Sequence, residues 1–405
     1  MSGTRHLRAA DLRGAGRLAI DATLALTSLV ENLHHNIQRA PGPLGVHSER
    51  SAAGVGGLVY RSIRGVTRLV GGGLDVVLGQ LSALLGPGAG VDSREREAVL
   101  AALNGVLGDH LEASGNPLAI PMKLRHLGQP LDLESSALAN TLPQPSRRLL
   151  LMVHGLCMGP LQWKRKGHDH GEVLAAEGGF TPLCLHYNTG LHISANGGLL
   201  ADRLRALLPA WPVPVDELVI VGHSMGGLVV RSAIEQASSR GDTWPRRLTK
   251  LVFLGTPHHG APLERGGHWV DVILGASPYT AAFARLGKIR SAGITDLRHG
   301  SLLEADWAGV DRFAHGHDTR IHVPLPEGVA CYAIAASLSR VAGDLHGKLL
   351  GDGLVPLDSA LGRHKQAARC LRFEPGRQWV GQGIGHLDLL SSPQVLAQLR
   401  TWLVA

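Results

Sequence analysis

The chain has 405 residues, of which 44% are hydrophobic and 18% charged, and its formal net charge is +7. This composition is ordinary for a globular protein, and it excludes a disordered chain and a multi-span membrane protein. The basic residues are scattered and aromatic residues make up only 4%, so no nucleic-acid partner is predicted. Weak attraction to an anionic membrane surface remains open.

The cysteines and the first residues of the chain indicate a compartment. The four cysteines lie far apart, which excludes a C-x-x-C motif and a disulfide framework: Cys157, Cys184, Cys331 and Cys370. The opening stretch MSGTRHLRAADLRG is charged and lacks the apolar core of a signal peptide. We therefore expect free thiols and a cytoplasmic protein, with membrane association left open.

Residues 1–145 are predicted to form a mainly helical N-terminal region of unknown role. A helix is expected over residues 94–107, after good capping residues at 92–93. In another segment apolar residues recur at steps of three or four and form a stripe on one helix face: Val66, Val70, Leu74, Val77, Leu81 and Leu84. Three glycines weaken this helix, so it needs a partner surface. Residues 146–405 are the favoured partner, and a second copy or a membrane remains open.

Residues 146–405 change to the pattern of an α/β domain. Short apolar runs alternate with helical stretches, and the last helix is expected over residues 392–403. This alternation predicts a mostly parallel sheet with helices on both faces. The expected strands are residues 149–155, 182–188, 217–224, 250–257 and 329–337.

A candidate nucleophile lies where the third of these strands ends. Gly222, Ser224 and Gly226 form a G-x-S-x-G pattern, which is weak by itself in a glycine-rich chain. Here an apolar strand precedes it and a helical stretch follows it, as in a nucleophile elbow. A Cβ atom at either glycine would crowd the neighbouring strand or helix. The turn would place the serine hydroxyl at a helix N-terminus, where negative charge is favoured.

Two backbone N–H groups are expected to form an oxyanion hole. The first belongs to Met225, directly after the nucleophile. The second should lie in the loop after an earlier strand, where His154-Gly155-Leu156 follows LLLMV. We therefore expect Leu156 to provide the second donor, with Gly155 allowing the backbone to turn inward.

The acid and the base of a triad should follow the serine in chain order. His386 precedes the last helix, in the place expected for the base. Asp352 lies in GDGLVP, after the strand that follows the nucleophile strand by two, and is the preferred acid. Asp344 and Asp358 remain rivals.

The other histidines give no metal prediction. His258 and His259 follow a strand end close to the expected site. His168 and His170 flank Asp169, but their spacing suits a metal poorly and no third ligand pair is evident. A loop or helix-capping role for Asp169 is favoured over zinc. No metal and no cofactor is predicted.

Together these motifs resemble a known group of enzymes. LLLMVHGLCMG, YNTGLHISANG, VGHSMGGLVVRSA, VFLGTPHHGAPLER, GDGLVP and GHLDLL resemble bacterial lipases and esterases of the α/β-hydrolase superfamily. GHSMGG followed by GTPHHG is similar to the GPI inositol-deacylase-like lipases. The resemblance covers residues 147–405, and residues 1–140 lie outside it. It implies Ser224 as nucleophile, Asp352 as acid, His386 as base and an ester or amide carbonyl in the substrate.

Three classes of function follow from this interpretation. The favoured one is a serine hydrolase of lipidic or medium-chain carboxylic esters. A non-catalytic binding protein and an acyltransferase or thioesterase with the same triad remain open. Residues 260–328 are where such enzymes carry a lid, and their apolar middle at 268–287 suits either a flap or plain helical packing.

Overall fold

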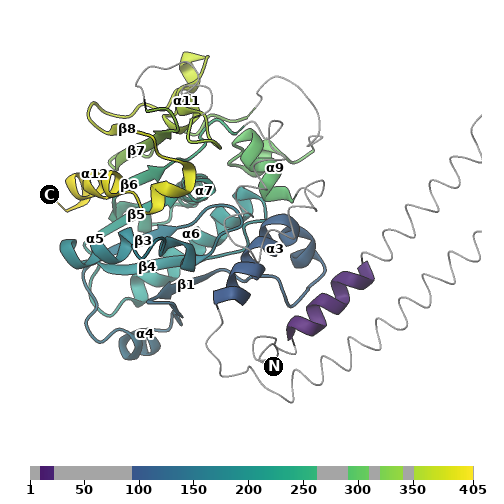
Figure 1. Ribbon diagram of the computed structural model, residues 1–405. Coiled ribbons are helices and arrows are strands. Elements are labelled where there is room, and N and C mark those ends of the chain that lie inside the picture. The colour runs from purple at the N-terminus through teal and green to yellow at the C-terminus, as the bar shows by residue number, and fades with distance from the viewer. Residues whose placement is uncertain (1–9, 22–93, 262–290, 310–319, 341–350, 405) are drawn as a thin grey trace, which may run out of the picture. The chain divides into compact units, whose positions relative to one another are not determined.

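The structure, a computed structural model, describes residues 10–21, 94–261, 291–309, 320–340 and 351–404. All five apolar runs form strands of one eight-stranded sheet (Figure 1). The strands are β1 (Lys123–His126), β2 (Gln129–Pro130), β3 (Arg148–Val153), β4 (Thr181–His186), β5 (Glu217–His223), β6 (Leu248–Leu254), β7 (Ala330–Ser337) and β8 (Gln378–Gln382).

The strand order is β2-β1-β4-β3-β5-β6-β7-β8. Strands β3 to β8 pair in parallel, whereas β1 pairs antiparallel with both β2 and β4. The predicted mostly parallel sheet of an α/β hydrolase is therefore confirmed. Strands β1, β2 and β8 were not predicted, because they are short and lack a continuous apolar run.

Helices follow most of the parallel strands. The α-helices are α3 (Arg94–Ala113), α4 (Ser135–Thr141), α5 (His170–Gly178), α6 (Ile193–Ala210), α7 (Met225–Arg240), α9 (Ala292–His299), α11 (Leu357–Ala360) and α12 (Pro393–Leu403). The 3-10 helices are η1 (Pro160–Trp163), η2 (Trp244–Arg247), η5 (Glu304–Asp306), η6 (Ala367–Arg369) and η7 (His386–Leu390).

The two faces of the sheet bury different residues of the same strands. Alternate residues, such as Val219 and Val221 of β5, pack with Leu174 of α5 and Leu399 of α12 in one core. On the other face α7 approaches β6, where a Cβ atom added at Gly227 would lie 2.9 Å from the Phe253 ring. Because both faces are covered, the continuous apolar character of the central strands is explained.

The chain divides into two compact units. The first holds residues 1–96 and 111–119, and the second holds residues 97–110 and 120–405. In the described part of the first unit, a helix over residues 10–21 is joined to Arg96 by an ion pair with Asp11 at 2.6 Å. The predicted stripe at residues 66–84 lies outside the described residues. A domain boundary near residue 145 therefore stays a prediction.

Within the second unit, residues 97–110 of α3 pack against the loops of the sheet. Ser291 donates a hydrogen bond to the carbonyl oxygen of Gly105 at 2.7 Å, and Asn188 donates one to that of Gly108 at 2.9 Å. A Cβ atom at Gly105 would lie 2.9 Å from the Cα atom of Cys157. The helix therefore supports the loop that follows β3.

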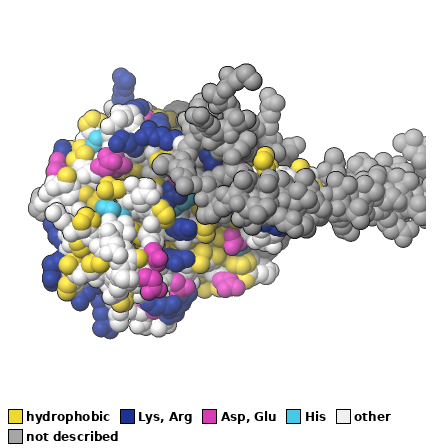
Figure 2. Space-filling model, turned by 90° about the horizontal axis from the view of Figure 1, so that it is seen from below, with side chains coloured by type: hydrophobic (Ala, Val, Ile, Leu, Met, Phe, Trp, Pro, Cys, Tyr) yellow, Lys and Arg dark blue, Asp and Glu magenta, His cyan; other side chains and the backbone are white. Residues whose placement is uncertain are grey.

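Two features concern the surface. None of the helices among the described residues is both long and apolar enough to cross a membrane. On the face seen in Figure 2, the basic side chains are dispersed among acidic and hydrophobic ones. The apolar stretch at residues 268–287, expected to form a lid or a packed helix, lies outside the described residues.

Candidate active site

Ser224 sits in a sharp turn between β5 and α7. Its backbone has φ 54° and ψ −125°, a conformation that is rare for a residue with a side chain. Its N–H donates to the carbonyl oxygen of Leu254 on the neighbouring strand at 2.8 Å. Strained residues of this kind persist where the surrounding structure holds them, and they cluster at active sites.

The glycines on either side of Ser224 make this turn sterically feasible. A Cβ atom at Gly222 would lie 2.7 Å from the Cα atom of Gly227 in α7. A Cβ atom at Gly226 would overlap the carbonyl oxygens of Val153 and His154 at the end of β3. Strand and helix therefore approach each other more closely than any larger residue permits.

Asp352 and His386 form a buried pair. The Nδ1 atom of His386 lies 2.7 Å from the Oδ2 atom of Asp352, and both side chains are almost fully buried. The second carboxylate oxygen accepts N–H groups from Leu354 at 3.0 Å and Val355 at 2.8 Å. The N–H of His386 also donates to the carbonyl oxygen of Asp352 at 3.0 Å. The carboxylate is thus fixed by three contacts and holds the ring orientation of His386.

The rival acids differ sharply from Asp352. Asp358 is 56% exposed and lies 3.7 Å from Arg363 in a surface ion pair. Asp344 lies outside the described residues. Of the two described candidates, only Asp352 contacts a histidine.

His386 lies next to the elbow. Its ring centroid is 4.7 Å from that of His223, the residue before Ser224. The Nε2 atom of His223 lies 3.3 Å from the carbonyl oxygen of His386. The hydroxyl of Ser224 is 2% exposed and has no hydrogen-bond partner among the described residues. The serine hydroxyl and the Nε2 atom of His386 therefore make no hydrogen bond with each other, and such catalytic contacts often tighten only in the reacting complex.

The predicted oxyanion donors lie beside Ser224. A Cβ atom at Gly155 would lie 3.0 Å from the Cβ atom of Ser224, so the loop after β3 touches the elbow. Leu156 is buried, and the chain turns at Cys157, whose φ is 57°. Within the described ranges, neither the N–H of Leu156 nor that of Met225 donates a hydrogen bond. The oxyanion hole formed by these two N–H groups stays a prediction.

Cys157 lies in this loop, and its thiol differs from the serine hydroxyl in being a poor candidate for the nucleophile. Burial raises the pKa of Cys157 to about 12. The thiol is therefore protonated at neutral pH and a poor nucleophile, because the thiolate is the reactive form. All four cysteines carry free thiols, as expected from their spacing.

Two residues of the site were not singled out from the sequence. His223 is fully buried, and burial followed by the neighbouring His386 holds its pKa well below the ordinary value, so the ring is neutral. Gly255 has φ 57°, and a Cβ atom there would lie 3.1 Å from Oδ2 of Asp352 and 3.2 Å from Nδ1 of His386. In the sequence, His223 is marked only as the second residue of G-H-S-M-G, and Gly255 only as the glycine of LGTP.

The histidines near residue 169 have a structural role. Asp169 accepts the N–H of Glu172 at 3.1 Å and caps α5, which confirms the capping prediction. His168 and His170 contact each other at 2.7 Å, and His170 reaches the carbonyl oxygen of Leu389 at 3.0 Å. The described part of the chain holds no cluster of residues suited to a metal ion.

Comparison with known proteins agrees with this fold. Residues 147–327 match the family model of the PGAP1-like alpha/beta domain. That range contains Ser224 and Leu156, but it ends before Asp352 and His386. Esterase PIR7B of Oryza sativa subsp. japonica is 31% identical over 137 residues, which is 29% of this chain and 44% of the relative.

Solved structures of lipases and esterases also align with the chain. The mature lipase BlEst2 of Bacillus licheniformis is 16% identical, with a TM-score of 0.42, covering 65% of this chain and 94% of that one. The Pyrobaculum calidifontis esterase is 15% identical, with a TM-score of 0.38, covering 81% of this chain and 99% of that one. The mostly parallel sheet and the match over residues 147–327 agree with the resemblance indicated by the motifs: the chain has the sheet of an α/β hydrolase, and residues 147–327 are similar to the PGAP1-like alpha/beta domain.

Proposed function

We propose that the chain cleaves carboxylic esters of lipidic or medium-chain acids through an acyl-enzyme on Ser224. The observation that carries this proposal is the buried Asp352–His386 pair at 2.7 Å, held beside the strained elbow that presents the serine. A binding protein has no need for a buried imidazole–carboxylate pair next to a strained serine. The sequence relative named an esterase, which is 31% identical over 137 residues, supports an ester substrate.

In the first step Ser224 attacks the substrate carbonyl while His386 accepts the hydroxyl proton. Because Nδ1 of His386 donates to Asp352, its Nε2 atom carries the lone pair that takes this proton. The carboxylate stays ionised and stabilises the imidazolium that forms. The N–H groups of Leu156 and Met225 stabilise the tetrahedral oxyanion, and removing one such donor costs roughly 10²–10³ in rate in comparable sites.

The tetrahedral intermediate then collapses, and the acyl-enzyme that forms is hydrolysed in a second step. The alcohol departs with the proton from His386, and the acyl-enzyme remains. Water then attacks the acyl carbonyl while His386 removes a proton from the water. The bond between the acyl carbon and the serine oxygen breaks, the carboxylic acid leaves, and His386 returns the proton to the serine oxygen. No cofactor takes part in this scheme. Acting on lipidic esters, the protein would work at a membrane surface from the cytoplasm.

Turnover of p-nitrophenyl esters of rising chain length tests this function. We expect hydrolysis by the wild type, with kcat/KM rising from acetate to medium-chain acyl groups. Ser224→Ala should lose activity by roughly 10⁴–10⁶-fold, because it removes the nucleophile. Ser238→Ala, on the exposed face of the same helix, is the matched control and should keep full activity. Equal activity of the two variants would contradict the proposal.

A further inference from the structure

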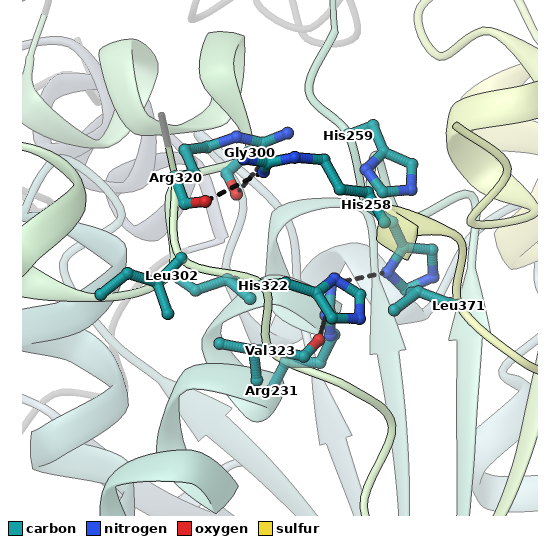
Figure 3. A pocket seen from close by; sticks show the side chains of 11 residues that line it. Arg231, His258, His259, Gly300, Leu302, Arg320, His322, Val323 and Leu371 are labelled. Carbon is teal, nitrogen blue, oxygen red and sulfur yellow. Dashed lines mark hydrogen bonds between the residues drawn. The ribbon is translucent and has the colours of Figure 1, made fainter. Parts of the chain in front are cut away.

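A second cluster of buried polar groups lies beyond the loop that follows β6. It lines a small pocket whose walls come from α7, this loop and three later segments (Figure 3). Among the described residues, the lining contains three arginines and three histidines but no aspartate or glutamate. Its residues are Arg231, His258, His259, Gly300, Leu302, Arg320, Ile321, His322, Val323, Arg369 and Leu371.

Arg231 is the most buried charge in this pocket. It is 4% exposed, and its guanidinium donates to the carbonyl oxygen of Val323 and lies 3.3 Å from Nδ1 of His258. No carboxylate lies within ion-pair distance of it in the described part of the chain, and its Nε–H group is buried without an acceptor. Burial, and then the neighbouring Arg320, lower its pKa to about 10, so it remains charged at neutral pH.

The contact with Arg231 fixes the tautomer of His258. A guanidinium has only donors, so Nδ1 of His258 must accept and Nε2 must carry the hydrogen. This Nε2–H group is also buried without an acceptor among the described residues. Burial, and then Arg231, hold the pKa of His258 well below its ordinary value, so the ring stays neutral. Two adjacent buried groups therefore each offer a donor that nothing accepts.

A buried cation without a counter-charge is strongly destabilising, and a water molecule would satisfy the donors but not the charge. An anion satisfies both. Arg320 and Arg369 line the same pocket, and their presence favours a doubly charged oxyanion over a monovalent one. His322 is exposed at the pocket, and partial burial, followed by the nearby Arg231 and Arg369, lowers its pKa.

We propose that this pocket binds a phosphate group, either as free inorganic phosphate or as the phosphate of a monoester. Arg231 supplies the buried positive charge, and Arg320 (Figure 3) and Arg369 add to it from later segments of the chain. The site is separate from the ester chemistry: its residues do not touch Ser224, Asp352 or His386 in the described contacts. It lies next to them through the loop from Gly255 to His258.

Thermal unfolding and calorimetric titration with inorganic phosphate test this site, at ionic strength held constant with sodium chloride. We expect a saturable rise in the wild-type Tm and saturable binding. Phosphate also stabilises proteins generally by exclusion from their surface, but that effect does not saturate. Arg231→Met should weaken binding at least tenfold. His322→Glu, an exposed change that places negative charge at the pocket, should do the same without disturbing the core.

The matched control is Arg203→Met, which removes an exposed arginine from α6, away from the pocket. It should bind phosphate like the wild type. Titration with glycerol 3-phosphate, with glycerol as its control, distinguishes the two sources. Tighter binding of the monoester identifies an organic phosphate, and weaker binding identifies the free ion. Absence of saturable binding of both probes, or equal binding by the wild type and His322→Glu, would overturn the proposal.

Discussion

Two buried ionisable clusters lie on either side of the loop that follows β6, and they differ in their charge balance. In the candidate active site, His386 faces Asp352, so an imidazolium formed there has its counter-ion within 2.7 Å. In the pocket, Arg231 is buried without a carboxylate within ion-pair distance in the described ranges. The balanced cluster is suited to hold a transient charge, whereas the unbalanced one is suited to bind a permanent anion.

The largest effect should come from breaking the balanced cluster. Asp352→Asn should lower kcat for ester hydrolysis by roughly 10²–10⁴, because the imidazole loses its orienting anion. Phosphate binding in the pocket should be unchanged. Asp358→Asn, at the exposed rival position, is the matched control and should keep kcat within about twofold of the wild type. A larger loss for Asp358→Asn would make our assignment of the acid wrong.

A substitution in the loop that follows β6 should affect the two clusters unequally. Gly255→Ala introduces a Cβ atom 3.1 Å from Asp352 and 3.2 Å from His386, at a φ of 57°. We expect kcat to fall by roughly 10–100-fold, which corresponds to about 1.4–2.7 kcal/mol of lost transition-state stabilisation. Phosphate affinity should stay within about twofold. Gly198→Ala, where the added Cβ atom meets only flexible side-chain ends, controls for a glycine change in itself. Equal losses of activity in the two variants would refute the claim that a Cβ atom at Gly255 disturbs Asp352 and His386.

The smallest effect concerns the pH dependence of stability. Burial, followed by nearby Arg320, lowers the pKa of His259 to about 4. The folded state therefore stays neutral there between about pH 6.5 and pH 4, while the unfolded chain takes up a proton. The unfolding free energy should fall as pH is lowered through this window. His259→Gln should flatten this slope by up to about 1.4 kcal/mol per pH unit in denaturant titrations. An unchanged slope would contradict a neutral buried ring.

Much of the candidate active site could be predicted because its signals are local or follow chain order. The elbow is contained in five consecutive residues, and Asp352 and His386 follow the strands where this fold places its acid and base. The edge of the sheet could not be predicted in this way. Strand β2 has two residues and β8 reads QWVGQ, so neither carries an apolar run.

The pocket was beyond prediction for a different reason. Arg231 lies on an apparently ordinary helix, and Arg320 and Arg369 come from segments far along the chain. Only the folded sheet brings these residues together. The sequence places the HHG motif after β6 close to the site. The contact of His258 with the buried Arg231 has no signal in the sequence.

The acyl-enzyme on Ser224 is tested most directly by covalent labelling with a fluorophosphonate and mass spectrometry of the digested protein. The account predicts one modified peptide, with the phosphonate on Ser224, and no label after Ser224→Ala. Ser238→Ala should be labelled like the wild type, since that side chain is exposed on the same helix. Label on another residue at the wild-type rate, or full labelling of Ser224→Ala, would contradict it.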